Sequence, residues 1–501
     1  MDILAVTGKM AENAVKKAVQ GEADVLVLDI DIAAFITPAL LRRYLPDKKY
    51  ELILISGLAS GDFSGLEKEI NTLIRLGPKH AVDLDFVLSF ADSLTFSTKV
   101  PACELLIEKR RSNAFGRVIE LEERSVSPLT LKGVKLGGDS RMKVMAEIVD
   151  AGHLTRGELI NRISYFVEKG ADIIDLGISL DTTLSEVRKA VKIASSVTAL
   201  PLSIDTLDPL LINAALDSGA DIVLSLNSEN INEVKENVIR HNAAAVVIPD
   251  CSCDLESLFK NIESAQYSGI TNIIADPVLE PPGSRFVESI NRYYEFRKRD
   301  PRTPLFFGAG NVTELMDADS IGINAMLSGI ASEFEASILF TPEFSSKAHD
   351  SVFELKTASM MMMLARERGS APKDLGIDML VIKEKRMREF AKLPENFIEA
   401  KGIEKWHLDP AGCFKIDITG DEIHGGKLEP GKIVAKNTPY LNAGTTGTRA
   451  IVGSTAREVL DTIIVLGLVS RLDHAAYLGR ELMKAELALK FKRSYSQDDK
   501  F

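Results

Sequence analysis

The stretch ADIIDLGIS (171–179), followed by PLSIDT (201–206) and ADIVLSLN (220–227), decides the fold. These segments are short and rich in Ile, Leu and Val, which is typical of strands buried on both faces. Between them, residues 184–197 repeat apolar side chains at helical spacing, and residues 210–219 end in a glycine, which is a helix C-cap signal. Strands that alternate with helices predict a parallel sheet with helical crossovers.

The same alternation extends outward on both sides of this stretch. Five further strand-like runs are MKVMAEIVD (142–150), AAVVIPD (244–250), NIIADPVL (272–279), PLFFGAGN (304–311) and EASILFTPE (335–343). An open doubly wound sheet explains six or seven such units but needs no eighth. Eight strands, with residues 348–369 as an eighth helix, predict a closed (β/α)8 TIM barrel within an α/β protein.

Polar residues stand at the ends of most of these strands. Each one alone could be an ordinary helix cap or turn residue. Because a barrel of this kind carries its chemistry at the carboxyl ends of its strands, together they predict a pocket rich in acceptors and poor in cations. Such a pocket suits a ring with several N–H donors, such as a pterin, whose N3–H and 2-amino group match one carboxylate. The residues are Asp150, Asp175, Asp205, Asn227, Asp250, Asp276 and Asn311.

The strings GADIIDLG (170–177), LPLSIDT (200–206) and IIADP (273–277), in this order, resemble the pterin-binding superfamily. Its members include dihydropteroate synthase and the methyltetrahydrofolate:corrinoid methyltransferases. The resemblance implies that Asp205 and Asp276 hold the pterin ring and that Asn227 fills the asparagine position after the fourth strand.

The string KAHDSV (347–352) resembles the family's Arg-Val-His-Asp motif, with a lysine in place of the arginine. Because this motif lies near the last strand, the resemblance makes Lys347 and His349 the candidates for contacting the leaving diphosphate of a synthase substrate.

Two departures from the synthase pattern point to the methyltransferase branch. AEIVDAGHLTRGE (146–158) lacks the synthase's first loop and loosely follows Gly-Glu-x-Ile-Asn, with Asp150 at the asparagine. GAGNVTE (308–314) replaces the synthase's Ser-Arg-Lys motif and looks like Gly-Leu-Ser-Asn-Val-Ser. In that branch the asparagine lies near the reacting nitrogen of the pterin, a role that the resemblance gives to Asn311.

Three functions follow from this resemblance. The first is condensation of a dihydropterin diphosphate with an arylamine in folate or tetrahydromethanopterin biosynthesis, with Mg²⁺ assisting charge neutralisation. The second is methyl transfer from a methyl-tetrahydropterin to a corrinoid. The third is binding of a pterin without catalysis. The resemblance also implies a homodimer.

The chain length of 501 residues predicts about three domains. We place an N-terminal α/β domain at 1–139, the barrel at 140–372 and a C-terminal α+β domain at 373–501. In the first, 2–8, 23–31, 50–57 and 81–90 are expected to be strands. In the last, we expect strands at 379–384, 413–419 and 432–437 and one or two helices within 456–491. This domain order resembles archaeal dihydropteroate synthase-related proteins.

Composition excludes several other classes of protein. With a net charge of −12, the chain carries no excess of positive charge that would attract the phosphates of a nucleic acid. No uncharged apolar run reaches the length of a membrane span, and the start shows no secretion signal, so we expect a cytoplasmic protein. Four cysteines cannot form a disulfide framework, and the pair Cys251 and Cys253 has no histidines at zinc-ligand spacing. We therefore predict no dedicated metal-ligand set.

Overall fold

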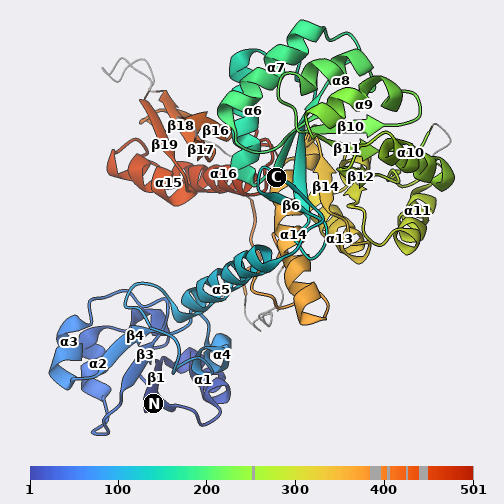
Figure 1. The fold of residues 1–501 in the computed structure, drawn as a ribbon. Coiled ribbons are helices and arrows are strands. Elements are labelled where there is room, and N and C mark those ends of the chain that lie inside the picture. Colours follow the sequence, from blue (N-terminus) through green and yellow to red (C-terminus); the bar gives the residue numbers. More distant parts are fainter. Residues whose placement is uncertain (251–253, 384–396, 403–406, 425–426, 439–448, 500–501) are drawn as a thin grey trace. The chain divides into compact units, whose positions relative to one another are not determined.

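The computed structural model describes residues 1–501 except 251–253, 384–396, 403–406, 425–426, 439–448 and 500–501 (Figure 1). Cys251 and Cys253 therefore lie outside the described residues. The chain falls into two compact units, one of Met1–Glu123 with Leu364–Asp378 and one of Arg124–Met363 with Met379–Phe501.

The second unit contains the predicted barrel of eight parallel strands. Neighbouring strands pair in chain order, β14 pairs with β7, and a parallel bridge between Ala275 and Leu305 completes the ring. All eight predicted strands are thus confirmed. They are β7 (Lys143–Ile148), β8 (Ile173–Gly177), β9 (Leu202–Asp205), β10 (Ile222–Leu226), β11 (Ala244–Val247), β12 (Ile273–Ala275), β13 (Phe306–Phe307) and β14 (Ile338–Thr341).

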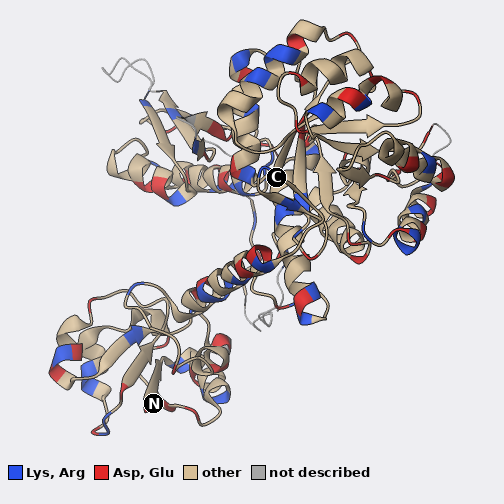
Figure 2. Ribbon diagram, in the orientation of Figure 1, with Lys and Arg blue, Asp and Glu red and all other residues tan. Residues whose placement is uncertain are grey.

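Helices surround this barrel (Figure 1). Thr155 and Thr183 begin the first two with capping boxes, and Gly170 ends the first with a left-handed φ of 97°. Acidic and basic residues are interspersed along the outer helices, as Figure 2 shows. The helices are α6 (Arg156–Lys169), α7 (Leu184–Val197), α8 (Pro209–Leu216), α9 (Ile231–Arg240), α10 (Leu255–Tyr267), α11 (Phe286–Arg299), α12 (Gly310–Thr313), α13 (Ser320–Glu333) and α14 (Ser351–Arg368).

A hairpin of β5 (Leu129–Leu131) and β6 (Val134–Leu136) packs against the inner core of the barrel. Its leucines contact a cluster that contains Ile173, Ile222 and Ile338, which lie at the starts of their strands. The amino end of the barrel is therefore filled, and the carboxyl end is left for a ligand. The hairpin belongs to the compact unit of the barrel, although we placed these residues in the first domain.

The C-terminal part combines a small sheet with two helices. The antiparallel sheet has the order β15 (Cys413–Ile418), β18 (Ile433–Thr438), β19 (Arg449–Gly453), and β16 (Glu422–His424) pairs with β17 (Lys427–Glu429). The helices α15 (Ala456–Val465) and α16 (Leu472–Lys490) share a hydrophobic core with this sheet. The predicted strands at 413–419 and 432–437 are confirmed, whereas the one at 379–384 is wrong because 379–383, its described part, are irregular.

The first unit has a parallel sheet in the order β2 (Asp24–Val27), β1 (Ile3–Thr7), β3 (Leu52–Ile55), β4 (Leu73–Leu76). Helices α1 (Glu12–Val19), α4 (Leu84–Leu88) and α5 (Ala102–Arg124) share one core with the sheet. Helices α2 (Pro38–Tyr44) and α3 (Ser64–Ile70) share the other. The fold is thus a doubly wound α/β layer.

The strand that we predicted at 81–90 is wrong. These residues form a 3-10 turn and α4, which buries Leu84, Val87 and Leu88 at helical spacing. The fourth strand is instead Leu73–Leu76, in which Arg75 interrupts the apolar run. Among the residues that the structure describes, none of the helices combines the length and apolar character of a membrane span.

Candidate functional site

Three acidic side chains meet inside the carboxyl end of the barrel. The strand register places Glu147 of β7 opposite Asp175 of β8, and Gly177 of β8 opposite Asp205 of β9. Because side chains alternate along a strand, Glu147 and Asp175 share the inner face with Met145 and Ile173 of the core. One oxygen of each of the three carboxylates lies within 4.8 Å of the others. We call these three residues the acidic cluster.

The carboxyl groups of the acidic cluster are removed from solvent. The side chain of Asp175 is fully buried, and among the described residues only the Ser203 hydroxyl favours its charged form. Burial, followed by the charges of Asp205 and Glu147, raises the pKa of Asp175 well above its ordinary value. No Lys or Arg among the described residues forms an ion pair with the cluster. A cation or an N–H donor would therefore be stabilised strongly here.

The pKa values of Glu147 and Asp205 are also raised. Burial, followed by the charges of Asp205, Asp150 and Glu314, raises the pKa of Glu147 to about 7. Burial also raises the pKa of Asp205, and a hydrogen bond from Ser225 counteracts part of this effect. The three groups interact closely enough to titrate together rather than one by one.

Asp276 follows β12 and adds a fourth carboxylate, held in a fixed orientation. Its Oδ1 accepts hydrogen bonds from the Tyr293 hydroxyl at 2.9 Å and from the Val278 N–H at 2.8 Å. Both bonds end on Oδ1, which leaves Oδ2 for a ligand. Burial raises the pKa of Asp276 to about 6, and the charge of Asp205 contributes in the same direction.

Gly177 makes room for the acidic cluster. It faces inward beside Asp205, and a Cβ at this position would overlap Oε1 of Glu147. The glycine of the IDLG string therefore lets the Glu147 carboxylate lie across β8. Any larger residue would push this carboxylate away.

The other residues predicted at the strand ends differ in their exposure and in their hydrogen-bond partners. Asn227 is buried, and its Oδ1 accepts the Glu229 N–H at 3.0 Å, which fixes the turn before α9. Asp150 is exposed with φ 53°, accepts a hydrogen bond from the Ser179 hydroxyl, and lies close enough to influence Glu147. Asn311 lies in α12, and its Nδ2 donates to the Leu279 carbonyl at 2.8 Å.

Lys347 and His349 lie on one segment after β14 but pair with different groups. Lys347 forms an ion pair with Asp317 at 2.7 Å. The His349 ring lies near Tyr165, and its Nδ1 is 3.8 Å from Oδ1 of Asp350. The structure therefore does not join these two predicted residues into one contact.

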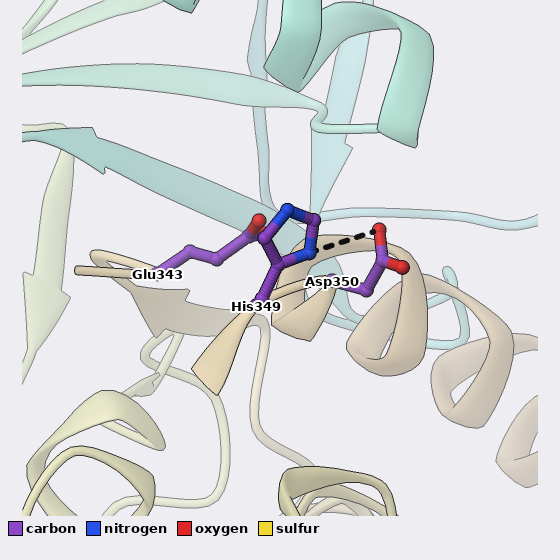
Figure 3. Close-up of side chains that lie close together, drawn as sticks. All are labelled: Glu343, His349 and Asp350. Carbon is purple, nitrogen blue, oxygen red and sulfur yellow. Dashed lines mark ion pairs between the residues drawn. The ribbon is translucent and has the colours of Figure 1, made fainter. Parts of the chain in front are cut away.

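A second group of possible metal ligands comprises Glu343, His349 and Asp350 (Figure 3). Glu343 already accepts hydrogen bonds from the Tyr165 hydroxyl at 2.5 Å and from the Val352 N–H at 3.1 Å. Asp350 forms an ion pair with Lys169. These carboxylates are satisfied by the protein itself. In the described part of the chain, the carboxylates of the acidic cluster have fewer hydrogen-bond and ion-pair partners than those of this second group.

Sequence reasoning missed Glu147 because it considered the ends of the strands. A usable signal was present, since alternation along Lys143, Met145 and Glu147 places every second side chain inside the barrel. A carboxylate at such an inward position is unusual in a packed barrel core.

Residues 148–277 match the family model described as pterin binding enzyme, and residues 408–498 match the model described as PterinBD-DUF4346. An uncharacterized protein of Methanocaldococcus jannaschii is 37% identical over 529 residues, which covers 99% of this chain and 98% of that protein.

Two solved structures are also similar. Dihydropteroate synthase of Yersinia pestis in a sulfonamide drug complex is 18% identical, covers 48% of this chain and 99% of its own, and has a TM-score of 0.40. Dihydropteroate synthase of Xanthomonas albilineans with 7,8-dihydropteroate is 20% identical, covers 47% and 96%, and has a TM-score of 0.37.

Proposed function

This chain belongs to the same family as the Methanocaldococcus protein, and part of its barrel matches the model of pterin-binding enzymes; on that premise we propose that the barrel condenses a dihydropterin diphosphate with an arylamine. The observation that carries the proposal is the acidic cluster at the carboxyl end of the barrel, with Asp276 beside it. The proposal includes a role in folate or tetrahydromethanopterin biosynthesis, a cytoplasmic location and a homodimer.

The acidic cluster and Asp276 supply hydrogen-bond acceptors for the N–H donors of a pterin ring. The N3–H and 2-amino groups of the ring can donate a pair of hydrogen bonds to the two oxygens of one carboxylate. Asp205 is intermediate in exposure and faces inward at the carboxyl end, whereas Asp175 lies deeper and is fully buried. Asp205 is therefore the ring ligand in this proposal, and Oδ2 of Asp276 accepts a second ring donor. Rings without these donors would leave buried carboxylates unpaired, which selects against them.

The proposed reaction replaces one bond at the exocyclic methylene carbon. The bond between this carbon and the diphosphate oxygen breaks, and its electron pair leaves with the diphosphate. The arylamine nitrogen then bonds to the carbon and loses a proton to the solvent. Positive charge develops on the ring as the diphosphate leaves, and the carboxylates of Asp205 and Asp276 stabilise it.

Glu147, and the pair of Lys347 and His349, also have roles in the proposed reaction. With a pKa of about 7, Glu147 can hold or release a proton at neutral pH. The negative charge of the acidic cluster next to the ring can therefore increase or decrease. Lys347 and His349 would contact the diphosphate. The ion pair of Lys347 involves Asp317, whose side chain is almost fully exposed, and such a pair is weak enough to exchange for a diphosphate.

Mg²⁺ forms part of the proposal as a partner of the diphosphate. It would neutralise charge on the leaving group, as metal ions do in phosphoryl chemistry. The arylamine contributes only its nitrogen, so either 4-aminobenzoate or a ribosylated arylamine fits the reaction.

Methyl transfer from a methyl-tetrahydropterin to a corrinoid is the second candidate. The observation in its favour is the exposed residue Asn311 on α12, in the segment that resembles the methyltransferase branch. Nδ2 of Asn311 is held by the Leu279 carbonyl, which leaves Oδ1 as an acceptor for a protonated ring nitrogen.

A parallel assay separates these functions. The full chain is incubated with 6-hydroxymethyl-7,8-dihydropterin diphosphate, Mg²⁺ and either arylamine, and the condensed product is followed by chromatography. Asp276→Asn should abolish product formation. Asp250→Asn is the matched control, because Asp250 also follows a barrel strand but is bonded to Asn261 and Ser228.

Each alternative has its own outcome. Methyl transfer to cob(I)amide without condensation would replace the first function by the second. If neither assay yields a product, but calorimetry detects pterin binding that Asp276→Asn abolishes, the protein binds a pterin without catalysis.

A further inference from the structure

The first unit contains a cavity that the barrel function does not use. In its sheet, β2 and β3 lie on opposite sides of β1, so the loops that follow β1 and β3 leave on opposite faces. In open parallel sheets, such a point of reversal forms a crevice at the carboxyl ends of the strands, where ligands bind. A cavity of about 260 Å³ lies at this point, lined by the ends of β1 and β3 and by the loops after all four strands.

Close contacts between glycine-containing loops lie next to this cavity. A Cβ on Gly8 would lie 2.8 Å from the Asp31 carbonyl oxygen, and a Cβ on Gly57 would lie 2.6 Å from that of Gly77. The Gly57 N–H donates to the Pro78 carbonyl at 3.0 Å, and the Met10 N–H donates to the Asp31 carbonyl at 3.1 Å. The backbone therefore holds the loops that border the cavity close together.

The walls are mostly apolar and remain open to solvent. Met10, Ile32 and Leu58 line the cavity, yet their exposed fractions are 78%, 48% and 52%. Apolar side chains gathered around a preformed cavity are typical of a site that receives the flat face of a ring. Thr7 and Ser56 also line the cavity.

The charges near the cavity disfavour a phosphate group. Lys9 forms an ion pair with Asp29, and Lys79 forms one with Glu104, so a phosphate would have to compete with a carboxylate for either lysine. The first turn of α1 carries Glu12, which would repel an anion. Asp31 also lines the cavity, and no residue in the described part of the chain pairs with its carboxylate. The remaining charge is therefore an acceptor for hydroxyl or amino donors.

We propose that this cavity binds a nucleoside without a phosphate, with the base against the apolar wall and the ribose hydroxyls donating to Asp31. An acidic residue near the end of the second strand, about 20 residues after the first turn, has this role toward ribose in doubly wound folds. Asp31 follows Gly8 at a comparable distance in the sequence. The size of the cavity accommodates one nucleoside and is too small for a dinucleotide.

Equilibrium dialysis of the full chain with radiolabelled adenosine or guanosine tests this proposal. We expect saturable binding of at least one nucleoside at one site per chain, and binding at least tenfold weaker for its 5′-monophosphate. Ala33→Trp would fill the cavity and should abolish binding, and Asp31→Asn should weaken it about tenfold. Asp47→Asn removes an exposed carboxylate that does not line the cavity, and it should leave binding unchanged.

Several results would overturn the proposal. They are no binding of either nucleoside, tighter binding of the monophosphate, or binding that Ala33→Trp leaves intact. If Asp205→Asn abolishes nucleoside binding while Ala33→Trp does not, the nucleoside occupies the barrel, and the proposed site is wrong. Calorimetric unfolding of each variant shows whether a loss of binding reflects a loss of folding.

Discussion

Replacing Glu147 by glutamine tests whether the acidic cluster is destabilising when it is charged. The ordinary pKa of a glutamate is 4.5, and in the folded protein the pKa of Glu147 is about 7. A raised carboxyl pKa means that the folded state binds the proton more tightly than the unfolded state. The stability is therefore fully present below pH 4.5 and is lost as the pH rises through 7.

The size of the effect follows from the same pKa values. One pKa unit corresponds to about 1.4 kcal/mol, so the ionised Glu147 destabilises the fold by up to about 3 kcal/mol above pH 7. Glutamine is neutral at every pH and removes this cost. We expect Glu147→Gln to raise the free energy of unfolding by about 1–3 kcal/mol at pH 8 and to change it little at pH 4.5.

Differential scanning calorimetry at both pH values measures this difference. A gain of that size raises the melting temperature of a domain of this length by several degrees. Asp250→Asn is the control with the opposite sign, because hydrogen bonds from Asn261 and Ser228 lower the pKa of Asp250. It should destabilise the protein at pH 8. An effect of Glu147→Gln that is equal at both pH values, or a loss of stability at pH 8, would refute the account of the acidic cluster.

Four other predictions concern ligand binding. Asp276 has a pKa of about 6, so pterin affinity should fall as the pH drops below 6. Calorimetric titration should show that Asp276→Asn reduces this dependence and removes most of the affinity. Gly177→Ala would displace the Glu147 carboxylate and should weaken pterin binding about tenfold, whereas an unchanged dissociation constant would speak against a role for the acidic cluster. Lys347→Ala should raise the KM for the diphosphate substrate without changing the affinity for 6-hydroxymethylpterin. Chelation of Mg²⁺ should stop condensation and leave binding of 6-hydroxymethylpterin intact, and equal loss of both would place the ion in the ring site.

The barrel could be predicted from the sequence because its signals agree with one another. Buried parallel strands are continuous apolar runs. The first two helices between them begin at Thr155 and Thr183 with capping boxes, and the first of these helices ends at Gly170. Asp205 and Asp276 could be found because they stand where strands end. These are local patterns, and no long-range information is needed to see them.

Glu147 and the first unit show where sequence patterns are insufficient. Glu147 lies within a strand, and its importance depends on the register that places it beside Asp175 and Asp205. Residues 81–90 are a short apolar run that fits a strand or a helix equally well, and packing against β1 and β3 makes part of it α4. The cavity at the end of β1 arises from the strand order, which no single segment encodes.

A crystal structure of the full chain with 6-hydroxymethylpterin tests the central claim most directly. The account predicts a ring at the carboxyl end of the barrel, with hydrogen bonds to Asp205 and to Oδ2 of Asp276, and with Asn227 beside it. A ring bound away from both carboxylates, or no binding at the barrel at all, would contradict the account.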